Sequence, residues 1–424
     1  MKKIIIIGGG FAGLNLAKQL RNNPHYQITI VDRNNYVFFP PLLYQVATGF
    51  LEPSNISYPY RKMLRRFKNA RFKIGEVEKV VPDSNKIILS TGELDYDILV
   101  FATGTKTNFF GMENVQKNAI PMKTVNDALE MRNYLLSQME IACTLSKRDD
   151  LTKALNIVVA GGGPTGVEIS GMLAEMRQSI FIKDYPELAK KKVVSHIYLV
   201  DGGSELLGPM SKKSQEDTYN ALSKLGVEII LNTRVQDFID DTVILNDGRK
   251  IHTKNLIWAA GVTGQLFDGI PADSFGPGKR LLVDAYNQLI NFNNIYSIGD
   301  SCVQSSDINF PNGHPQVAQV ALQQGKNLGK NFLRMNRNQP LIPFNYKDKG
   351  SMAIIGRNKA VVDIPPRFHF KGFFAWFIWV FIHLMSLVHY RNRVLTFVNW
   401  VIAYFTKDQA LRMIIRPAKK SEKN

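Results

Sequence analysis

The chain has 424 residues, of which 45% are hydrophobic and 21% are charged, a balance that excludes an intrinsically disordered protein. This length excludes a single hydrophobic core, so we expect two or three domains. The formal net charge of +17 predicts an anionic partner, and the lack of any zinc-finger or RNA-binding signature favours a membrane surface over nucleic acid.

The first predicted element is a buried strand, the apolar run 4–7, which leads into the spacing G-x-G-x-x-G and then a helical pattern. In such a unit the first glycine makes a tight turn, the second admits a pyrophosphate to the backbone, and the third packs the helix on the strand. The next strand-like run ends at an aspartate about 20 residues on, where a carboxylate can bind the adenosine ribose. The residues expected at this first dinucleotide site are Gly8, Gly10, Phe11, Ala12, Gly13 and Asp32.

The same pattern recurs around residues 157–166, where another apolar strand breaks into G-x-G-x-x-G. The following strand, 197–200, ends at an aspartate after a longer gap, because residues 181–192 insert a polar, lysine-rich stretch. An aspartate there repels a 2′-phosphate, and the next residues contain no arginine to bind one, so NADH is favoured over NADPH. The residues expected at this second site are Gly161, Gly163, Thr165, Gly166 and Asp201.

Each half closes with an apolar strand and a turn of small residues, one ending in Thr103 and Gly104 and the other in Gly261. A further strand, 294–298, leads to Asp300, and we interpret it as the return of the chain to the first domain. The expected fold is α/β, with two Rossmann-like dinucleotide-binding domains, the second inserted in the first, and a C-terminal membrane-binding helical segment. The expected boundaries are 1–115 and 285–345, 116–284, and 346–424.

Residues 373–390 contain long apolar stretches without charge, close to the roughly 20 residues that a membrane span needs. A single crossing from a cytosolic body would place many lysines and arginines outside, against the positive-inside tendency. Residues whose side chains carry a hydrogen-bonding group instead recur at spacings of three and four, so they share one helical face. They are Trp376, Trp379, His383, Ser386 and Tyr390. This pattern favours a monotopic helix on anionic lipid at the cytoplasmic face, with a buried helix of a homodimer as the alternative. The first strand follows Met1 almost directly, so we expect the body to stay where it is synthesised.

These motifs, together with P-L-L-Y-Q-V-A-T-G at 41–49 and A-Q-V-A-L-Q at 318–323, cover nearly the whole chain in a fixed order. In them the chain resembles the type II NADH dehydrogenases, single-subunit NADH:quinone oxidoreductases of the two-dinucleotide-binding flavoprotein superfamily. The resemblance implies FAD in the first domain, NADH in the second, and a membrane quinone of the respiratory chain as electron acceptor. It implies no metal.

The resemblance also assigns roles to single residues. It places Val77 near the adenine, Asp300 at the ribityl–pyrophosphate region, and Thr103, Gly104, Ala318 and Gln319 at the FAD site. Gly261 joins the cofactor-binding residues, and Gln319 and Gln323 are assigned to the quinone. These two glutamines share one helical face, and the alternative for them is a polar helix surface.

Glu168 is the expected catalytic residue, which the resemblance places beside the nicotinamide and the flavin. It follows the second fingerprint in the first turn of the helix, where the helix dipole stabilises a carboxylate whatever its function.

Three other functions share parts of this pattern. A sulfide:quinone oxidoreductase needs reactive cysteines, and disulfide reductases need a dithiol, whereas this chain has only Cys143 and Cys302, far apart. A non-catalytic NADH-dependent membrane tether is the alternative outside enzymes, and rapid quinone reduction would exclude it.

Overall fold

The computed structural model describes residues 1–191, 195–406 and 411–415, which divide into two compact units. Unit 1 comprises Met1–Phe38, Ser57–Lys106 and Val262–Lys349. Unit 2 comprises Phe39–Ile56, Thr107–Gly261 and Gly350–Asn424. The chain passes between the units within β10 (Lys106–Thr107) and before β19 (Val262–Thr263).

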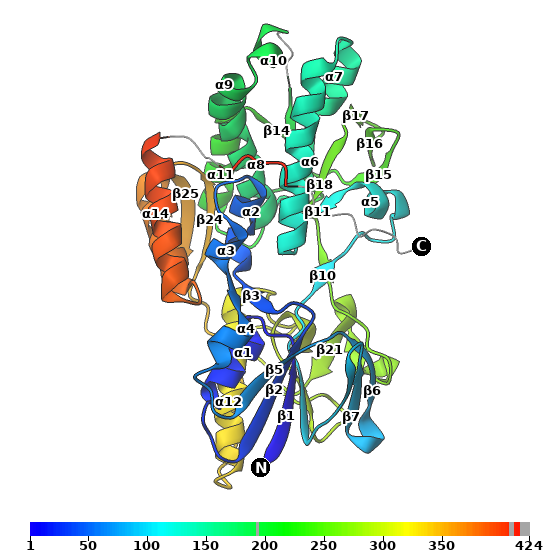
Figure 1. Ribbon diagram of the computed structural model, residues 1–424, viewed down its shortest axis with the longest axis vertical. Helices are drawn as coiled ribbons and strands as arrows, with labels where there is room; N and C mark the ends of the chain where they lie inside the picture. Colours follow the sequence, from blue (N-terminus) through cyan, green and yellow to red (C-terminus); the bar gives the residue numbers. More distant parts are fainter. Residues whose placement is uncertain (192–194, 407–410, 416–424) are drawn as a thin grey trace. The chain divides into compact units, whose positions relative to one another are not determined.

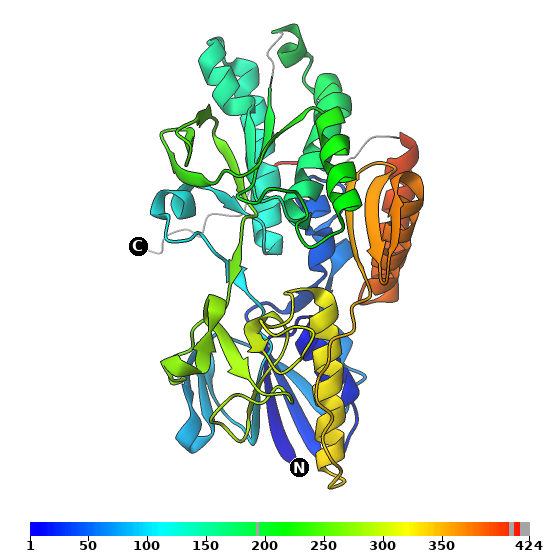
Figure 2. The ribbon, with the colours of Figure 1, turned by 180° about the vertical axis from the view of Figure 1, so that it is seen from behind.

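Unit 1 is built on a parallel sheet with the strand order β22-β9-β1-β2-β5 (Figure 1). Its strands are β1 (Lys2–Ile7), β2 (Tyr26–Asp32), β5 (Ala70–Ile74), β9 (Ile98–Phe101) and β22 (Ile295–Ser297). β1 is central, and its run of isoleucines is buried because both faces of the sheet are covered. α1 (Phe11–Gln19) and α12 (Ala318–Met335) pack side by side, with Gly13 of α1 against Ile6 (Figures 1 and 2). Ile5 and Ile7 point to the other face and join a core with the smaller sheets.

The remaining elements of unit 1 are short. They are β3 (Tyr36–Phe38), β4 (Ser57–Pro59), α4 (Tyr60–Leu64), β6 (Val77–Val81), β7 (Lys86–Leu89), β8 (Gly92–Asp95), β20 (Phe275–Gly276), β21 (Arg280–Val283), the 3₁₀ turn η6 (Gly299–Ser301) and β23 (Cys302–Gln304).

Unit 2 repeats the plan with a parallel sheet ordered β11-β18-β12-β13-β14. Its strands are β11 (Ile120–Pro121), β12 (Ile157–Ala160), β13 (Ile197–Val200), β14 (Val227–Ile230) and β18 (Asn255–Trp258). An antiparallel sheet follows, with β15 (Val235–Ile239), β16 (Thr242–Leu245) and β17 (Lys250–His252). The helices are α2 (Leu43–Ala47), α3 (Pro53–Ile56), α5 (Glu113–Asn118), α6 (Val125–Thr144), α7 (Arg148–Leu155), α8 (Pro164–Met176), α9 (Ile182–Asp184), α10 (Pro186–Lys190) and α11 (Lys212–Lys224).

The C-terminal part of unit 2 is an antiparallel sheet followed by two helices (Figures 1 and 2). It contains β24 (Ser351–Gly356), β25 (Lys359–Ile364), β26 (Phe368–Lys371), α13 (Gly372–Ser386) and α14 (Tyr390–Thr406). Helix α8 packs directly on β24, because a Cβ atom on Gly171 would overlap the carbonyl oxygen of Ile355.

The units and the expected domains differ at several places. Residues 262–284 were expected in the second domain but belong to unit 1, because β21 pairs with β23 and Phe267 packs into the core around Ile5. Residues 107–115, expected in the first domain, belong to unit 2. Residues 39–56 also belong to unit 2, because Asn392 of α14 donates hydrogen bonds to the carbonyls of Ser54 and Asn55. The described C-terminal residues lie in unit 2 and form no separate unit.

Candidate functional site

The turn between β1 and α1 requires glycine at the first and third positions of the first fingerprint. Gly8 has a φ of +98°, and a Cβ atom there would overlap the carbonyl oxygen of Ala102. A Cβ atom on Gly13 would overlap the carbonyl oxygen of Gly8, so helix and turn are in direct contact. Gly10 begins the helix, no side chain caps it, and none of the described atoms lies within 4 Å of an added Cβ. Uncapped N–H groups beside open space form an anion-binding site at the helix N-terminus.

The turn between β12 and α8 in unit 2 has the same construction. Gly161 has a φ of +112°, and a Cβ atom there would lie 2.5 Å from the carbonyl oxygen of Ala259. A Cβ atom on Gly166 would overlap the carbonyl oxygen of Gly161. Gly163 begins the helix without a side-chain cap, and an added Cβ would meet no described atom within 4 Å. Each unit therefore contains a turn with the geometry that phosphate binding requires.

The two aspartates occupy equivalent places beside these turns. Asp32 Oδ2 accepts a hydrogen bond from Gly9 N at 2.9 Å and from the hydroxyl of Tyr60 at 3.2 Å. Asp201 Oδ2 accepts from Gly162 N at 2.5 Å, and its Oδ1 accepts from Gly203 N at 2.6 Å. Each carboxylate is thus fixed at the end of its strand by the glycine turn, where ribose hydroxyls are bound in such folds.

An arginine lies beside the second aspartate, which the sequence analysis did not expect. A Cβ atom on Gly202 would lie 2.5 Å from Nε of Arg234, so this side chain crosses the loop that follows Asp201. Arg234 comes from the loop after β14, and it reaches Gly202 because β13 and β14 are adjacent parallel strands. The residues that follow Asp201 in the sequence contain no arginine, and the pairing of the two strands brings Arg234 to this place instead.

The structure brings several of the predicted FAD-site residues of unit 1 together around the start of α1. Gly299, at the head of the turn that contains Asp300, would place a Cβ atom 3.2 Å from that of Ala12 and 3.4 Å from that of Ala321. Gly299 N also donates to Gln324 Oε1 of α12 at 2.6 Å. Gly104 has a φ of +64° and no described atom within 4 Å of an added Cβ, whereas Val77 packs partly buried against the core.

The two glutamines of α12 contact the segment that follows that helix. Gln323 donates through Nε2 to Lys347 O at 2.9 Å, and its Oε1 accepts from Lys347 N at 3.1 Å. Gln319 Oε1 accepts from Lys349 N at 3.1 Å. They are therefore not a plain polar helix surface, because their amides hold the backbone of residues 347–349.

Glu168 is a buried carboxyl group on the face of α8 that packs on β24. Its exposed fraction is 8%, and it lies four residues after Pro164, in the second turn of the helix. Burial raises the pKa of Glu168 well above its ordinary value, and the N–H of Ile354 only partly offsets this effect. The expectation that the helix dipole stabilises its charge is wrong, because Glu168 lies beyond the first turn and desolvation outweighs the dipole.

Two further polar residues accompany Glu168 in unit 2. Burial and the charge of Glu168 raise the pKa of the Tyr44 hydroxyl, which accepts a hydrogen bond from Gln45 Nε2 at 2.9 Å. Gln45 Oε1 in turn accepts from Trp400 Nε1 at 2.7 Å. The sequence analysis used Tyr44 and Gln45 only as part of a motif, since nothing local indicates that α2 packs near α8.

Comparison with known proteins identifies the family. The sequence model of the pyridine nucleotide-disulphide oxidoreductases matches residues 2–325, and that of the NDH2 C-terminal domain matches residues 349–407. The type II NADH:quinone oxidoreductase NdhA of Mycobacterium tuberculosis is 33% identical over 419 residues, which cover 95% of this chain and 87% of that protein. The chain belongs to the type II NADH:quinone oxidoreductases.

Two more comparisons agree with this membership. The type II NADH:quinone oxidoreductase Ndh of Mycobacterium tuberculosis is 31% identical, over 95% of this chain and 88% of that protein. The solved structure of NDH2 from Plasmodium falciparum in complex with NADH has a TM-score of 0.88 at 24% identity, covering 98% of this chain and 100% of that one. This likeness shows the same fold, so the predicted α/β class is confirmed, and the two Mycobacterium tuberculosis relatives confirm the family resemblance stated above.

The cysteines of this type II NADH:quinone oxidoreductase do not provide a reactive thiol. Burial raises the pKa of Cys302 to about 12, and burial also raises the pKa of the Cys143 thiol. A thiol with a raised pKa is a poor nucleophile at neutral pH. The chemistry of a sulfide:quinone oxidoreductase or a disulfide reductase therefore has no support in these residues.

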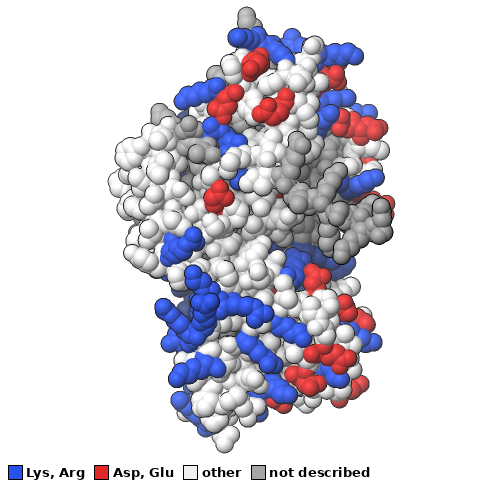
Figure 3. All heavy atoms as spheres, viewed as in Figure 1, with Lys and Arg blue, Asp and Glu red and all other residues white. Residues whose placement is uncertain are grey.

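The C-terminal helices of this family member expose apolar faces. The exposed side chains include Phe374, Phe377, Phe381, Ile382, Met385, Phe397, Val401, Ile402 and Phe405. The surface over α14 is almost free of charged side chains (Figure 3). Among the helices that the structure describes, none has the length and hydropathy needed to cross a bilayer.

The predicted polar face of this region is present only in part. Trp379 is buried, and its ring stacks on His383 with centroids 4.0 Å apart. Burial lowers the pKa of His383 to about 4, so this imidazole is neutral at physiological pH. The prediction of one continuous helix is wrong, because α13 ends at Ser386 and Tyr390 begins α14.

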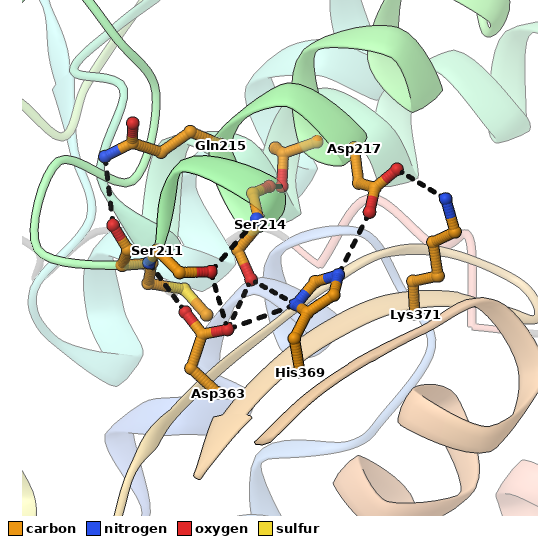
Figure 4. Close-up of polar contacts among 9 residues, drawn as sticks. Ser211, Ser214, Gln215, Asp217, Asp363, His369 and Lys371 are labelled. Atoms are coloured by element: carbon orange, nitrogen blue, oxygen red, sulfur yellow. Dashed lines mark hydrogen bonds and ion pairs between the residues drawn. The ribbon is translucent and has the colours of Figure 1, made fainter. Parts of the chain in front are cut away.

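A polar network joins the C-terminal sheet to α11 (Figure 4). His369 contacts Asp217 Oδ2 through Nε2 and Asp363 Oδ1 through Nδ1, both at 3.1 Å. Lys371 pairs with Asp217 at 2.9 Å, and Ser214 Oγ donates to Asp363 Oδ1 at 2.8 Å. These contacts hold the sheet that precedes α13 against the nucleotide-binding part of the same unit.

Unit 1 carries a separate basic surface on and around α4. Figure 3 shows Lys and Arg side chains gathered over this region, and the exposed residues include Arg61, Lys62, Arg65, Arg66 and Lys68. Arg61 lies over the ring of Phe72 at 5.5 Å, and Lys62 lies over that of Tyr58 at 5.8 Å. Part of the positive charge of the chain is thus concentrated on one surface.

Proposed function

We propose that this chain oxidises NADH through a bound FAD and passes the electrons to a membrane quinone. The observation that carries this proposal is the pair of phosphate-binding turns, one in each unit, which agree in glycine geometry, uncapped helix start and hydrogen-bonded aspartate. Two such turns fit two dinucleotides. The family membership given above supports the assignment of these to FAD and NADH.

The turn of unit 1 fits FAD. The open position at Gly10 leaves room for the pyrophosphate against the free N–H groups of α1, and Asp32 is placed for the adenosine ribose. Ala12 lies beside the turn that carries Asp300, because even a Cβ atom on Gly299 would crowd it, so both meet the same end of the helix. The other residues that we assign to this site are Gly8, Phe11, Gly13, Val77, Thr103, Gly104, Ala318 and Gln319.

The turn of unit 2 fits NADH. Gly163 provides the open approach to the first turn of α8, and Asp201 can accept hydrogen bonds from ribose hydroxyls. Gly161, Thr165, Gly166 and Gly261 complete the assigned set. The carboxylate disfavours a 2′-phosphate, while Arg234 beside Gly202 reduces this penalty, so we infer a preference for NADH that is not absolute.

When bound, the flavin supplies the two-electron chemistry, accepting a hydride from NADH and giving two electrons to the quinone. Quinone reduction also consumes two protons, and Glu168 is the residue that we assign to this supply. Because burial raises its pKa, its carboxyl group holds a proton at a pH where an exposed glutamate has lost it. We place the quinone carbonyl near Gln319 and Gln323, where contact with Gln323 requires exchange of one hydrogen bond to Lys347.

We infer further that the protein is a monotopic protein of the cytoplasmic face of the membrane. The apolar faces of α13 and α14 suit the interface between acyl chains and headgroups, and the basic residues of the chain favour an anionic leaflet. Extraction from membranes by alkaline carbonate is expected, since it spares true spans. A soluble homodimer that buries these faces would contradict the inference.

The function is tested by recording the flavin spectrum during anaerobic titration. Addition of NADH should bleach the flavin absorbance of the purified protein at one equivalent, and a water-soluble quinone analogue should restore it. A protein that stays colourless after FAD is supplied, or whose flavin ignores NADH, would refute the proposal. A flavin that NADH bleaches but quinone does not restore would indicate the non-catalytic tether instead.

A further inference from the structure

Unit 2 contains a cavity between α8, the β24–β25 hairpin and the two C-terminal helices. Its volume is about 370 Å³, within the usual range of small-molecule sites. Met172 and Met176 of α8 form one wall, and Val380 and Ala403 contribute from α13 and α14. None of the residues to which we assign a cofactor lines it.

The cavity wall is unusually rich in tryptophan. Trp376, Trp379 and Trp400 line it, which are three of the four tryptophans of the chain. The ring centroids of Trp376 and Tyr404 are 5.4 Å apart, and those of Trp379 and Trp400 are 5.8 Å apart. Aromatic rings of α13 thus contact aromatic rings of α14 in the wall of the cavity. Such walls suit a hydrocarbon chain and donate hydrogen bonds only where an indole N–H is available.

Two buried donors that line this cavity lack a partner among the described residues. Trp379 is 1% exposed, and its Nε1 has no hydrogen-bond acceptor. Nε of Arg357 is also buried without an acceptor, while its guanidinium lies 4.3 Å over the ring of Tyr404. A buried donor without an acceptor is unfavourable, so both point to a ligand that brings acceptor oxygens.

The charge around the cavity selects among ligands with such oxygens. Arg357 lines it from the turn between β24 and β25, Lys359 lines it from the start of β25, and the carboxyl group of Glu175 is the acidic group there. Glu175 Oε1 accepts from Arg357 N at 2.7 Å. Two cations against one carboxyl favour an anionic ligand, whereas a quinone ring is neutral. The outer faces of the same two helices are apolar and exposed.

We propose that this cavity binds one anionic phospholipid, with the phosphate at Arg357 and Lys359 and an acyl chain among the tryptophans. The proposal rests on the membrane association proposed above, because α13 and α14 must lie at the bilayer to receive a lipid. It adds a specific site to that association, distinct from the general attraction between a basic protein and an anionic surface.

Native mass spectrometry of the full-length, flavin-loaded protein in mild detergent tests the site. We expect one retained dioleoylphosphatidylglycerol per chain, and at least about tenfold weaker retention of dioleoylphosphatidylcholine, since a charge-assisted contact is lost. Arg357→Gln and Lys359→Gln should each weaken retention of phosphatidylglycerol about tenfold. Trp379→Phe keeps the ring and removes the N–H, so it should weaken retention a few-fold.

Arg391→Gln is the matched control, because Arg391 is an exposed arginine of α14 that does not line the cavity. It should retain the lipid like the unmodified protein. Equal retention of both lipids, or equal loss in Arg391→Gln and Arg357→Gln, would overturn the site and leave only general surface attraction. Stoichiometric displacement of the lipid by a quinone analogue would also overturn it.

Flavin content and melting temperature show whether each variant is folded. If Arg357→Gln does not fold, the lipid retention of Lys359→Gln tests the site. Turnover of NADH with a water-soluble quinone analogue separates the two proposals. Normal turnover without lipid retention refutes only this site. Retained lipid without turnover refutes only the proposed function.

Discussion

The open position at Gly163 allows cofactor binding to be separated from folding. Gly163 has a φ of −74° and a ψ of −177°, which alanine adopts without strain, and no described atom lies within 4 Å of an added Cβ. Alanine also lowers the conformational entropy of the unfolded chain. We therefore expect Gly163→Ala to leave the free energy of unfolding unchanged or to raise it by up to about 1 kcal/mol.

The same methyl group should oppose the binding of NADH. It would project into the space through which the pyrophosphate approaches the N–H groups of α8. Loss of one hydrogen bond to a charged phosphate costs about 1.5–3 kcal/mol, and about 1.4 kcal/mol corresponds to a factor of ten. We expect the KM for NADH to rise about 10- to 100-fold, with the flavin absorbance per protein unchanged, because we assign FAD to the other turn, in unit 1.

The assay combines steady-state kinetics, the flavin spectrum and a melting curve. Gly166→Ala serves as the contrasting variant, because its Cβ would overlap the carbonyl oxygen of Gly161 and overpacking costs about 1–3 kcal/mol. That variant should lose melting temperature. An unchanged KM for NADH in folded, flavin-loaded Gly163→Ala would refute the assignment of this turn, and a large loss of stability would refute the open geometry.

Three further changes give independent outcomes. Because burial raises the pKa of Glu168, the folded protein keeps a proton that the unfolded chain loses as pH rises above the ordinary glutamate pKa, so the stability of the protein declines over that pH range. Glu168→Gln should therefore raise the melting temperature at pH 8 while slowing quinone turnover. If the melting temperature of the variant depended on pH as that of the unmodified protein does, this reasoning would be contradicted. Burial by itself would raise the pKa of Asp217, but hydrogen bonds from Lys371 and His369 outweigh burial and lower this pKa. The ionised carboxylate therefore stabilises the folded protein above the ordinary aspartate pKa, and this stabilisation is lost as pH falls through the lower pKa of the folded state. His369→Ala should cost about 1–2 kcal/mol in chemical denaturation at pH 7, and no loss would mean that the network does not hold the C-terminal sheet. Arg234→Gln should lower kcat/KM for NADPH about tenfold and change that for NADH by less than about twofold, since only a 2′-phosphate pairs with the guanidinium; equal losses would exclude this role.

The local chemistry of the glycine turns could be predicted from the sequence because it depends on residues close together in the chain. A buried apolar strand, three glycines at fixed spacing and a following helix determine the turn geometry at Gly8 and Gly161, and both show the positive φ that such turns need. The aspartates follow for the same reason, since the strand after the helix ends beside the turn. The family resemblance rests on these same local motifs.

The domain limits and the surroundings of the site depended on contacts between distant segments. The pairing of β21 with β23 decides that residues 262–284 belong to unit 1, and the hydrogen bonds of Asn392 decide that residues 39–56 belong to unit 2. Arg234 reaches Gly202 only because β13 and β14 are neighbours.

Sequence alone determined the order of strands and turns around the two glycine fingerprints and the apolar character of the C-terminal segment, because hydrophobic period and glycine spacing act over a few residues. Tertiary structure decided the protonation of Glu168 and the cavity with its unpartnered Trp379 donor, because desolvation depends on which elements pack against a side chain. Packing of α8 on β24 outweighs the helix dipole at Glu168, and neither the packing nor its effect is present in the sequence around that residue.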